Sequence, residues 1–274
     1  MDYTGIYINL ADSLTRRSDL ERQLAQLGAT DRYRRFEAIR GTQAGELAQT
    51  QLPAGQLGCW LSHLAVWRQA ESEGRHLHVL EDDVLLSPFL LRVFEELQLD
   101  ESSWDLLFTD VYFHPPPTPE QFAQLCAARQ AFLKEKKVSL IDLRTLAFTG
   151  TTSYFVNRRS LRRLGELMHG GWESNRTIDV VLQQLIRRGE LRGRVAFPFL
   201  TSLTSEHQRS TAGLEGPAIR GLDAFRQAWF YAAEPEAIYN RMTDCRCNWP
   251  SDPLLELYLN LLRGVLGTLQ HDSV

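Results

Sequence analysis

The amino-acid sequence predicts an α/β fold with a mostly parallel central sheet, and three observations lead to that prediction. Short stretches rich in β-branched and aromatic residues alternate with longer stretches of helical period. The chain has 274 residues, enough for one large α/β domain. Of these residues 43% are hydrophobic and 23% charged, as in a globular protein. Strands that alternate with helices assemble into a parallel sheet, so this class is the one expected.

The first hundred residues carry clear strand and helix signals. The predicted elements are a strand at residues 5–10, a helix from Asp12 or Ser13 to Leu27 that Gly28 ends, a strand at 36–39, a helix at 55–73 that Gly74 ends, and a strand at 77–80. The apolar positions of the second helix that we expect to face inward are Leu57, Trp60, Leu61, Leu64 and Ala65.

The same alternation continues through the rest of the chain. The predicted elements are a helix from Ser87-Pro88 to about residue 97, a strand from Trp104, a proline-rich break, a helix at 121–136, a strand at 152–157, a helix from residue 158, a helix capped by Asn175 or Thr177 that runs to 188, and a strand at 194–200. The chain then turns polar, and residues 221–270 are mostly helical. We therefore expect a domain over 1–205 and a helical extension over 206–274 that packs on it.

The last helix is apolar on most faces. Its apolar positions are Leu254, Leu255, Tyr258, Leu261, Leu262, Val265 and Leu269. We expect them to dock on the protein's own core, with homodimerisation or peripheral membrane contact as the alternatives. Only Arg263 is cationic there, so the basic face of a membrane-surface helix is absent.

Charge and cysteine content exclude other classes. The net charge of −4 gives no basic field for nucleic acid, so we expect no nucleic-acid partner. The N-terminus lacks a signal-peptide pattern, and no uninterrupted apolar run reaches the ~18 residues of a membrane span. The cysteines are Cys59, Cys126, Cys245 and Cys247, without zinc-site spacing. We expect a cytoplasmic protein, and the alternative is a protein that associates peripherally with the inner face of a bacterial membrane.

Three consecutive acids, Glu81, Asp82 and Asp83, follow the third predicted strand. Buried strands rarely run into unpaired carboxylates, because desolvating them is costly. Alternation along an extended chain places Glu81 and Asp83 on one side. Two carboxylates on one side suit Mg²⁺ or Mn²⁺, which typically bridge a protein carboxylate and a substrate phosphate. A solvated acidic turn is the other interpretation of the triplet.

Four segments in this order resemble glycosyltransferase family 25, whose members include bacterial lipooligosaccharide galactosyltransferases and collagen galactosyltransferase domains. They are YINLADSLTRR, GQLGCWLSHLAVWR, HVLEDDVLLSP and TGTTSYFVNRRSLRRL. The resemblance covers about residues 3 to 185. It implies a GT-A-like nucleotide-sugar-binding fold, a UDP-sugar donor and an inverting transfer. By the same likeness the acidic triplet corresponds to the family's Asp-x-Asp motif. Asp83 would be the direct metal ligand, and Glu81 would face the ribose or a metal-bound water.

The remaining candidate residues for binding the donor or metal are grouped in four segments. They are Asn9, Asp12, Arg16 and Arg17 after the first strand, Ser62 and His63 in the second helix, Thr149, Gly150 and Thr151 before a later strand, and His207 as a late metal ligand. Arginine forks match diphosphate oxygens, which is why Arg16 or Arg17 is expected to bind them. The alternative roles are a solvated basic helix face for Arg16 and Arg17, a structural position for His63, and an ordinary turn for residues 149–151.

An inverting transfer needs a general base for the acceptor hydroxyl. Asp179 follows the cap Thr177, and its Ile178-Asp179 pair matches the family pattern. We predict Asp179 as the base, Glu173 as the reserve and Asp110 as a third candidate. Charge complementarity to the helix dipole is the alternative role for Asp179.

The predicted activity is metal-dependent transfer of a hexose, with galactose favoured, from a UDP-sugar to a hydroxyl of a glycan, lipid-linked or peptide acceptor. One alternative is a Mg²⁺-dependent phosphohydrolase, although Asp12 lies beyond the first strand and not on it. The other is an inactive family member that binds nucleotide-sugar as a partner protein.

Overall fold

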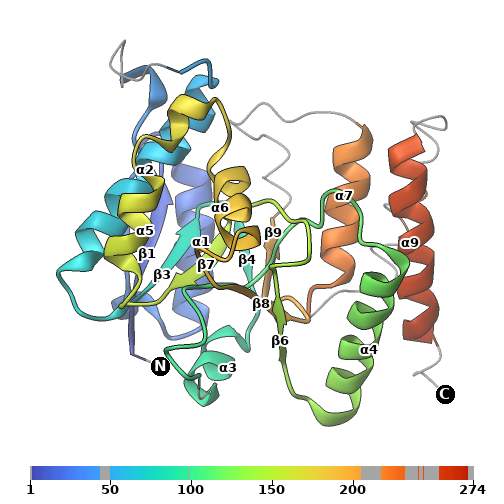
Figure 1. The fold of residues 1–274 in the computed structure, drawn as a ribbon. Helices are drawn as coiled ribbons and strands as arrows, with labels where there is room; N and C mark the ends of the chain where they lie inside the picture. The colour runs from blue at the N-terminus through green and yellow to red at the C-terminus, as the bar shows by residue number, and fades with distance from the viewer. Residues whose placement is uncertain are drawn as a thin grey trace.

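A computed structural model describes residues 2–43, 50–97, 99–204, 217–231, 240, 243 and 253–270. In these residues seven strands form one sheet in the order β2-β1-β3-β7-β5-β8-β6 (Figure 1). Their bounds are β1 (Tyr3–Asn9), β2 (Tyr33–Glu37), β3 (His76–Glu81), β5 (Leu106–Phe108), β6 (Ser139–Asp142), β7 (Ser153–Val156) and β8 (Gly193–Phe197). A separate antiparallel pair joins β4 (Val84–Leu86) and β9 (Thr201–Leu203).

The predicted mostly parallel α/β sheet is confirmed. The pairs β1–β2, β1–β3 and β5–β8 are parallel, while β7 and β6 run against their neighbours. The described helices are α1 (Leu14–Gln26), α2 (Ala54–Glu71), α3 (Leu90–Glu96), α4 (Pro119–Glu135), α5 (Leu161–Met168), α6 (Ile178–Arg187), α7 (Pro217–Ala228) and α9 (Pro253–Gln270), with short 3₁₀ turns η1 (Thr30–Arg32), η2 (Gly41–Gln43) and η4 (Gly171–Ser174). None of these helices is long and apolar enough to cross a membrane.

Side chains of the strands alternate between two hydrophobic cores, one on each face of the sheet. In β1, Ile6 and Ile8 belong to one core while Tyr3 and Tyr7 belong to the other. Helices α1 and α3 cover the tyrosine side, and α2, α5, α6, α7 and α9 contribute to the isoleucine side. Both faces are therefore covered, which explains why the strands are apolar almost throughout.

The described part of the C-terminal region shares this core. Leu255, Tyr258, Leu259 and Leu262 of α9 are fully buried, and α7 and α9 lie side by side (Figure 1). At these positions the helix packs into the larger of the two hydrophobic cores. The side chains of Val265 and Leu269 lie outside the described residues, and so do residues 205–216.

Several sequence-based predictions were wrong in detail. Strands β4, β6 and β9, which have three or four residues each, were not predicted. The predicted strand at 194–200 ends at Phe197, before Pro198, which cannot donate to a strand ladder. In α2, Leu61 and Ala65 are only partly buried, while Ser62 and His63 are buried. Helix α2 packs against both the sheet and α5, so it has no single apolar stripe.

A buried histidine makes folding stability depend on pH. His78 is 0% exposed and stacks on Phe155 with ring centroids 3.8 Å apart. Its ring nitrogens bond the hydroxyls of Tyr33 (2.7 Å) and Ser153 (3.0 Å). Burial lowers the pKa of His78 to about 3, so the folded protein keeps the ring neutral.

We therefore expect His78 to destabilise the fold as the pH drops. The unfolded chain protonates this ring below its ordinary pKa of about 6.5, whereas the folded chain does not until about 3. The unfolded state binds more protons in that window, so stability is lost as pH falls. In a His78→Gln variant this loss is absent. The difference in unfolding free energy between wild type and this variant should therefore become smaller by about 2 kcal/mol when the pH is lowered from 7 to 5. Urea unfolding at both pH values measures it, and a pH-independent difference would contradict the assignment.

A second prediction concerns the close approach of α2 to the loop after β2. A Cβ at Gly58 would lie 2.5 Å from the Ile39 carbonyl oxygen and 2.9 Å from the Gly41 nitrogen, both backbone atoms. Gly58→Ala should therefore lower the free energy of unfolding by about 1–3 kcal/mol. Gly165→Ala in α5 is the control, since a Cβ added there would have no neighbouring atom within 4 Å, and it should be neutral or stabilising by up to about 1 kcal/mol. Thermal and urea unfolding of both variants check this, and a Gly58→Ala protein as stable as wild type would refute the close contact.

Candidate functional site

A cavity of about 330 Å³ opens at the carboxyl ends of β1 and β3. Ligands of open α/β sheets bind at this edge. The cavity is lined by Ile8, Asn9, Leu10, Arg16, Ala38, Ile39, Arg40, Gly41, Thr42, Ala54, Gly55, Gly58, Cys59, Ser62, His63, Glu81, Asp82 and Asp83. A larger hollow of about 690 Å³ lies at the opposite ends of the strands, where its charged residues pair with one another, as Arg75 does with Asp2. The first cavity is therefore the candidate site.

Glu81 ends β3 and is held from two sides. Its Oε1 accepts a hydrogen bond from the Thr151 hydroxyl (2.6 Å) and lies 3.3 Å from His63 Nε2. Burial alone would raise the pKa of Glu81, but the hydrogen bond and charge of His63, together with Thr151, outweigh it and lower that pKa. The carboxylate is therefore kept ionised deep in the cavity.

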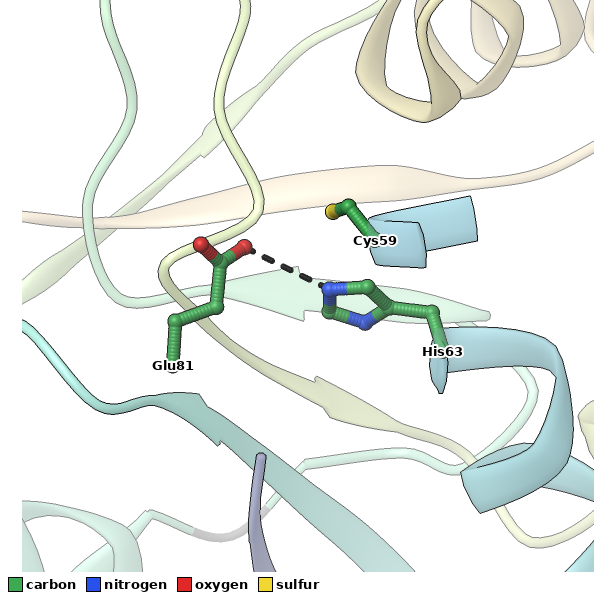
Figure 2. Close-up of side chains that lie close together, drawn as sticks. All are labelled: Cys59, His63 and Glu81. Carbon is green, nitrogen blue, oxygen red and sulfur yellow. Dashed lines mark ion pairs between the residues drawn. The ribbon is translucent and has the colours of Figure 1, made fainter. Parts of the chain in front are cut away.

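His63 is positioned by two aromatic residues. Its Nδ1 lies 2.7 Å from the Tyr154 hydroxyl, which also accepts a hydrogen bond from Trp67 Nε1 at 2.9 Å. His63 is 1% exposed, and its Nε2 has no hydrogen-bond partner of good geometry among the described residues. The ring is thus fixed at one nitrogen and directed at Glu81 with the other, as Figure 2 shows.

Asp82 closes the cavity on the side of β1. Asn9 Nδ2 donates to its Oδ2 at 2.8 Å, and Arg16 Nη1 donates to its Oδ1 at 3.1 Å. The same Arg16 nitrogen lies 4.0 Å from Asp83 Oδ2. The chain turns at Asp82 and Asp83, so the alternation expected of an extended strand ends at Glu81. One arginine consequently faces both aspartates.

Asp83 carries an unsatisfied oxygen. Its Oδ1 is buried without a hydrogen-bond partner in the described part of the chain. Burial, and next the negative charge of Glu81, raise the pKa of Asp83 to about 7. A positive charge beside Oδ1 would favour the ionised form of this carboxyl.

A loop before β7 joins Asp179 to the acidic triplet. The Gly150 N–H donates to Asp179 Oδ2 at 2.8 Å, and the next residue, Thr151, bonds Glu81. Gly150 has a φ of +99°, which disfavours a side chain at this turn. Thr149 pairs through its backbone with Tyr112. The predicted segment 149–151 and the predicted base are thereby brought to one place.

Other predicted residues have structural partners elsewhere. Arg17 bonds Glu21 at 2.9 Å along α1, and exposed Asp12 pairs with Arg40 at 2.5 Å. Ser62 lines the cavity, but its hydroxyl accepts a hydrogen bond from Ile39 N (2.8 Å) and donates one to Gly58 O (2.7 Å). It therefore holds the loop after β2 against α2.

Two further carboxylates proposed as bases do not share this arrangement. Glu173 is exposed in η4, and Asp110 is buried in an ion pair with Arg226 of α7. Because its charge is already matched, Asp110 is poorly suited to accept a proton. His207 lies outside the described residues.

Three residues of the site were not predicted. Arg40 lines the cavity, and the positive charge of Arg226 lies close enough to lower the pKa values of Glu81 and Asp83. Cys59 is the third: its pKa is raised well above the ordinary value by burial and then by the charges of Glu81 and Asp179. Only Cys59 had a signal in the sequence, since it lies four residues before His63 and so on the same helix face.

Comparison with known proteins gives one family match. The family model described as glycosyltransferase family 25 (LPS biosynthesis protein) matches residues 4–171, more than half of the chain. This segment includes β1, the cavity helix α2, the acidic triplet and the loop of Thr151. No curated protein matches the chain. From the cavity at the strand ends, the acidic triplet in it and the extent of this match, we conclude that the chain belongs to glycosyltransferase family 25.

Proposed function

We propose that this glycosyltransferase moves a hexose, galactose by preference, from a UDP-sugar to a hydroxyl of a glycan, lipid-linked or peptide acceptor, with inversion and with Mn²⁺ or Mg²⁺. The observation that carries the proposal is the buried, unsatisfied Asp83 Oδ1 at the mouth of a strand-end cavity. Lipopolysaccharide biosynthesis, named in the family description, is the setting that this proposal fits.

The cavity suits the nucleotide part of such a donor. Its volume of about 330 Å³ falls at the lower end of small-molecule pockets. Arg16 and Arg40 line it with positive charge next to the acidic triplet. We assign the diphosphate to Arg16 in preference to Arg17, because Arg17 is engaged by Glu21 on the outer face of α1. A guanidinium at the cavity can release an aspartate oxygen and bind a phosphate oxygen in its place.

The donor atoms at this site fit a hard divalent ion. Asp83 offers a free carboxylate oxygen, and oxygen is the ligand type that Mg²⁺ and Mn²⁺ prefer. Asp83 would hold the ion directly, with Glu81 at the ribose or at an ion-bound water. When bound, the ion would neutralise charge on the departing diphosphate.

Asp179 is the proposed general base. It comes from α6, a different element from the triplet on β3, and reaches the same loop through Gly150. Within the described ranges, each of its oxygens accepts one hydrogen bond, from Gly150 N and Val180 N respectively, which leaves a lone pair on each for the acceptor hydroxyl. Orientation by these bonds favours proton transfer in a fixed geometry.

The alternatives have less support. A phosphohydrolase of this fold would need a nucleophilic aspartate at the first strand, and Asp12 is instead exposed and paired with Arg40. An inactive nucleotide-sugar-binding protein would bind UDP-sugar tightly but would neither transfer the sugar nor hydrolyse the donor, even slowly. UDP release from a panel of UDP-sugars with Mn²⁺, with and without glycan acceptors, separates these three functions.

Removing the Asp83 carboxylate should abolish both transfer and the effect of metal on nucleotide binding. In wild type, UDP with Mn²⁺ at a hundredfold excess over its dissociation constant should stabilise the fold by about 2.7 kcal/mol. Asp83→Ala should lose the Mn²⁺-dependent part of this protection, measured by thermal unfolding with and without chelator.

Asp82→Asn is the matched comparison, since Asn still offers an acceptor oxygen to Arg16 and should retain most of the protection. Turnover of Asp83→Ala close to that of wild type would rule out the metal assignment.

Replacing the base should slow the chemical step without weakening donor binding. Asp179→Asn keeps the size of the side chain and an acceptor for Gly150 N–H but cannot take up a proton. We expect kcat to fall by at least ~10²-fold while the dissociation constant of UDP-sugar stays within about threefold.

Glu173→Gln is the comparison, and its exposed position predicts a smaller loss of kcat. A loss of donor binding in Asp179→Asn would show that Asp179 binds the donor or metal, and a larger effect at Glu173 would reverse the assignment.

A further inference from the structure

One cluster in the cavity includes a thiol, for which the proposed hexose transfer has no role. Cys59, His63 and Glu81 bring a sulfur, a ring nitrogen and a carboxylate oxygen within 4.8 Å of one another (Figure 2). We infer that these three residues form a binding site for a thiophilic divalent cation, Zn²⁺ in particular, and that a cation bound there excludes the sugar donor.

The backbone positions the three ligands before any metal arrives. Cys59 and His63 are four residues apart in α2, so they project from one face of the helix. Glu81 faces them from the end of β3, with its Oε1 at 3.3 Å from His63 Nε2. Tetrahedral Zn²⁺, with bonds of about 2.0–2.3 Å, separates its ligand atoms by roughly 3.3–3.8 Å. Side-chain adjustments of under about 1 Å would therefore complete three corners of the tetrahedron.

His63 is prepared as a ligand. Its Nε2 is buried, has no hydrogen-bond partner of good geometry among the described residues, and points into the cluster. On the other side of the ring, Nδ1 lies 2.7 Å from the Tyr154 oxygen. That oxygen accepts from Trp67 Nε1 and has a second lone pair for an Nδ1–H donor. A ligating histidine needs this kind of partner for its other nitrogen.

The donor set selects the type of ion. A thiolate, an imidazole and one carboxylate suit Zn²⁺ and Co²⁺, whereas Mg²⁺ prefers oxygen ligands alone. Binding would release to solvent the Cys59 thiol proton together with any proton carried by His63 Nε2, and the ligated ring keeps its proton on Nδ1. All three residues line the cavity, so the fourth position opens to solvent or to a bound molecule.

Occupation of this site would conflict with the donor site. Glu81 is bonded to Thr151 and lies two residues before Asp83, so a thiophilic cation would draw it away from its place beside the nucleotide and add charge at the cavity floor. This part of the inference rests on the proposed function. The metal site itself stands on the geometry of the three ligands alone.

Cobalt absorption spectra of the full chain test the site without any turnover. The first protein carries Cys126→Ser, Cys245→Ser and Cys247→Ser, which leaves Cys59 as its one cysteine. Added Co²⁺ should produce thiolate-to-cobalt charge-transfer absorption and the visible bands of tetrahedral Co²⁺. Equimolar Zn²⁺ should abolish both, and a hundredfold excess of Mg²⁺ should not.

Ligand variants identify the residues. Cys59→Ser should remove the charge-transfer absorption, and Tyr154→Phe, which removes the partner of His63 Nδ1, should weaken Co²⁺ binding by about 10–100-fold. Circular dichroism of each variant checks that it is folded. If the Cys59-only chain does not fold, the difference spectrum between the native chain and its Cys59→Ser variant gives the same comparison. No charge-transfer absorption, or the same absorption after Cys59→Ser, would overturn the site.

Whether a cation bound at this site excludes the donor is tested by measuring the affinity of the protein for UDP. In wild type, Zn²⁺ should raise the apparent dissociation constant of UDP with Mg²⁺ by at least ~10-fold, and this rise should be lost in Cys59→Ser. Zinc that binds without changing UDP affinity would overturn the exclusion. Absence of turnover with every UDP-sugar would count against the proposed function and leave the cobalt spectra unaffected.

Discussion

The concentration of negative charge at one edge of the sheet is the constraint on which the site depends. Glu81 ends β3, and Asp82 and Asp83 follow it. Asp179 of α6 accepts a hydrogen bond from Gly150, which lies next to Thr151, the residue that bonds Glu81. Partly buried carboxylates this close together repel one another and lose part of their hydration, so they need partners. The partners come from separate elements: Arg16 from α1, His63 from α2 and Thr151 from the loop before β7.

Helix α2 links this charged edge to the core. Trp60 is buried beside Trp172 of η4, with ring centroids 6.3 Å apart, and buried Trp67 donates to the Tyr154 hydroxyl of β7, which in turn contacts His63. On another side Gly58 lets the backbone of Ile39 approach, so the loop that lines the cavity lies directly on the helix. Helix α2 therefore connects the core to the cavity, whose lining includes its residues Gly58, Cys59, Ser62 and His63.

The described part of the C-terminal region also contributes to the electrostatics, beyond the segment that the family model matches. Arg226 of α7 is buried against Asp110, and its guanidinium lies 4.3 Å from the centroid of the Tyr112 ring. A buried ion pair adds little net stability but disfavours other arrangements of the helix on the sheet, because either charge alone would be costly. The positive charge of Arg226 acts to lower the pKa values of Glu81 and Asp83, so α7 favours the ionised forms of these two carboxyl groups.

The sequence by itself determined the α/β class, most of the helices and longer strands, and the acidic triplet at a strand end, because these follow from hydrophobic period and local breakers. Only the tertiary structure decided which partners meet those acids. It placed Arg16 beside Asp82 and Arg17 beside Glu21, paired Asp110 with Arg226, and brought Cys59 close to His63 and Glu81. Such choices depend on how segments distant in the chain pack together, and apart from the spacing of Cys59 and His63 in α2 no local pattern encodes them.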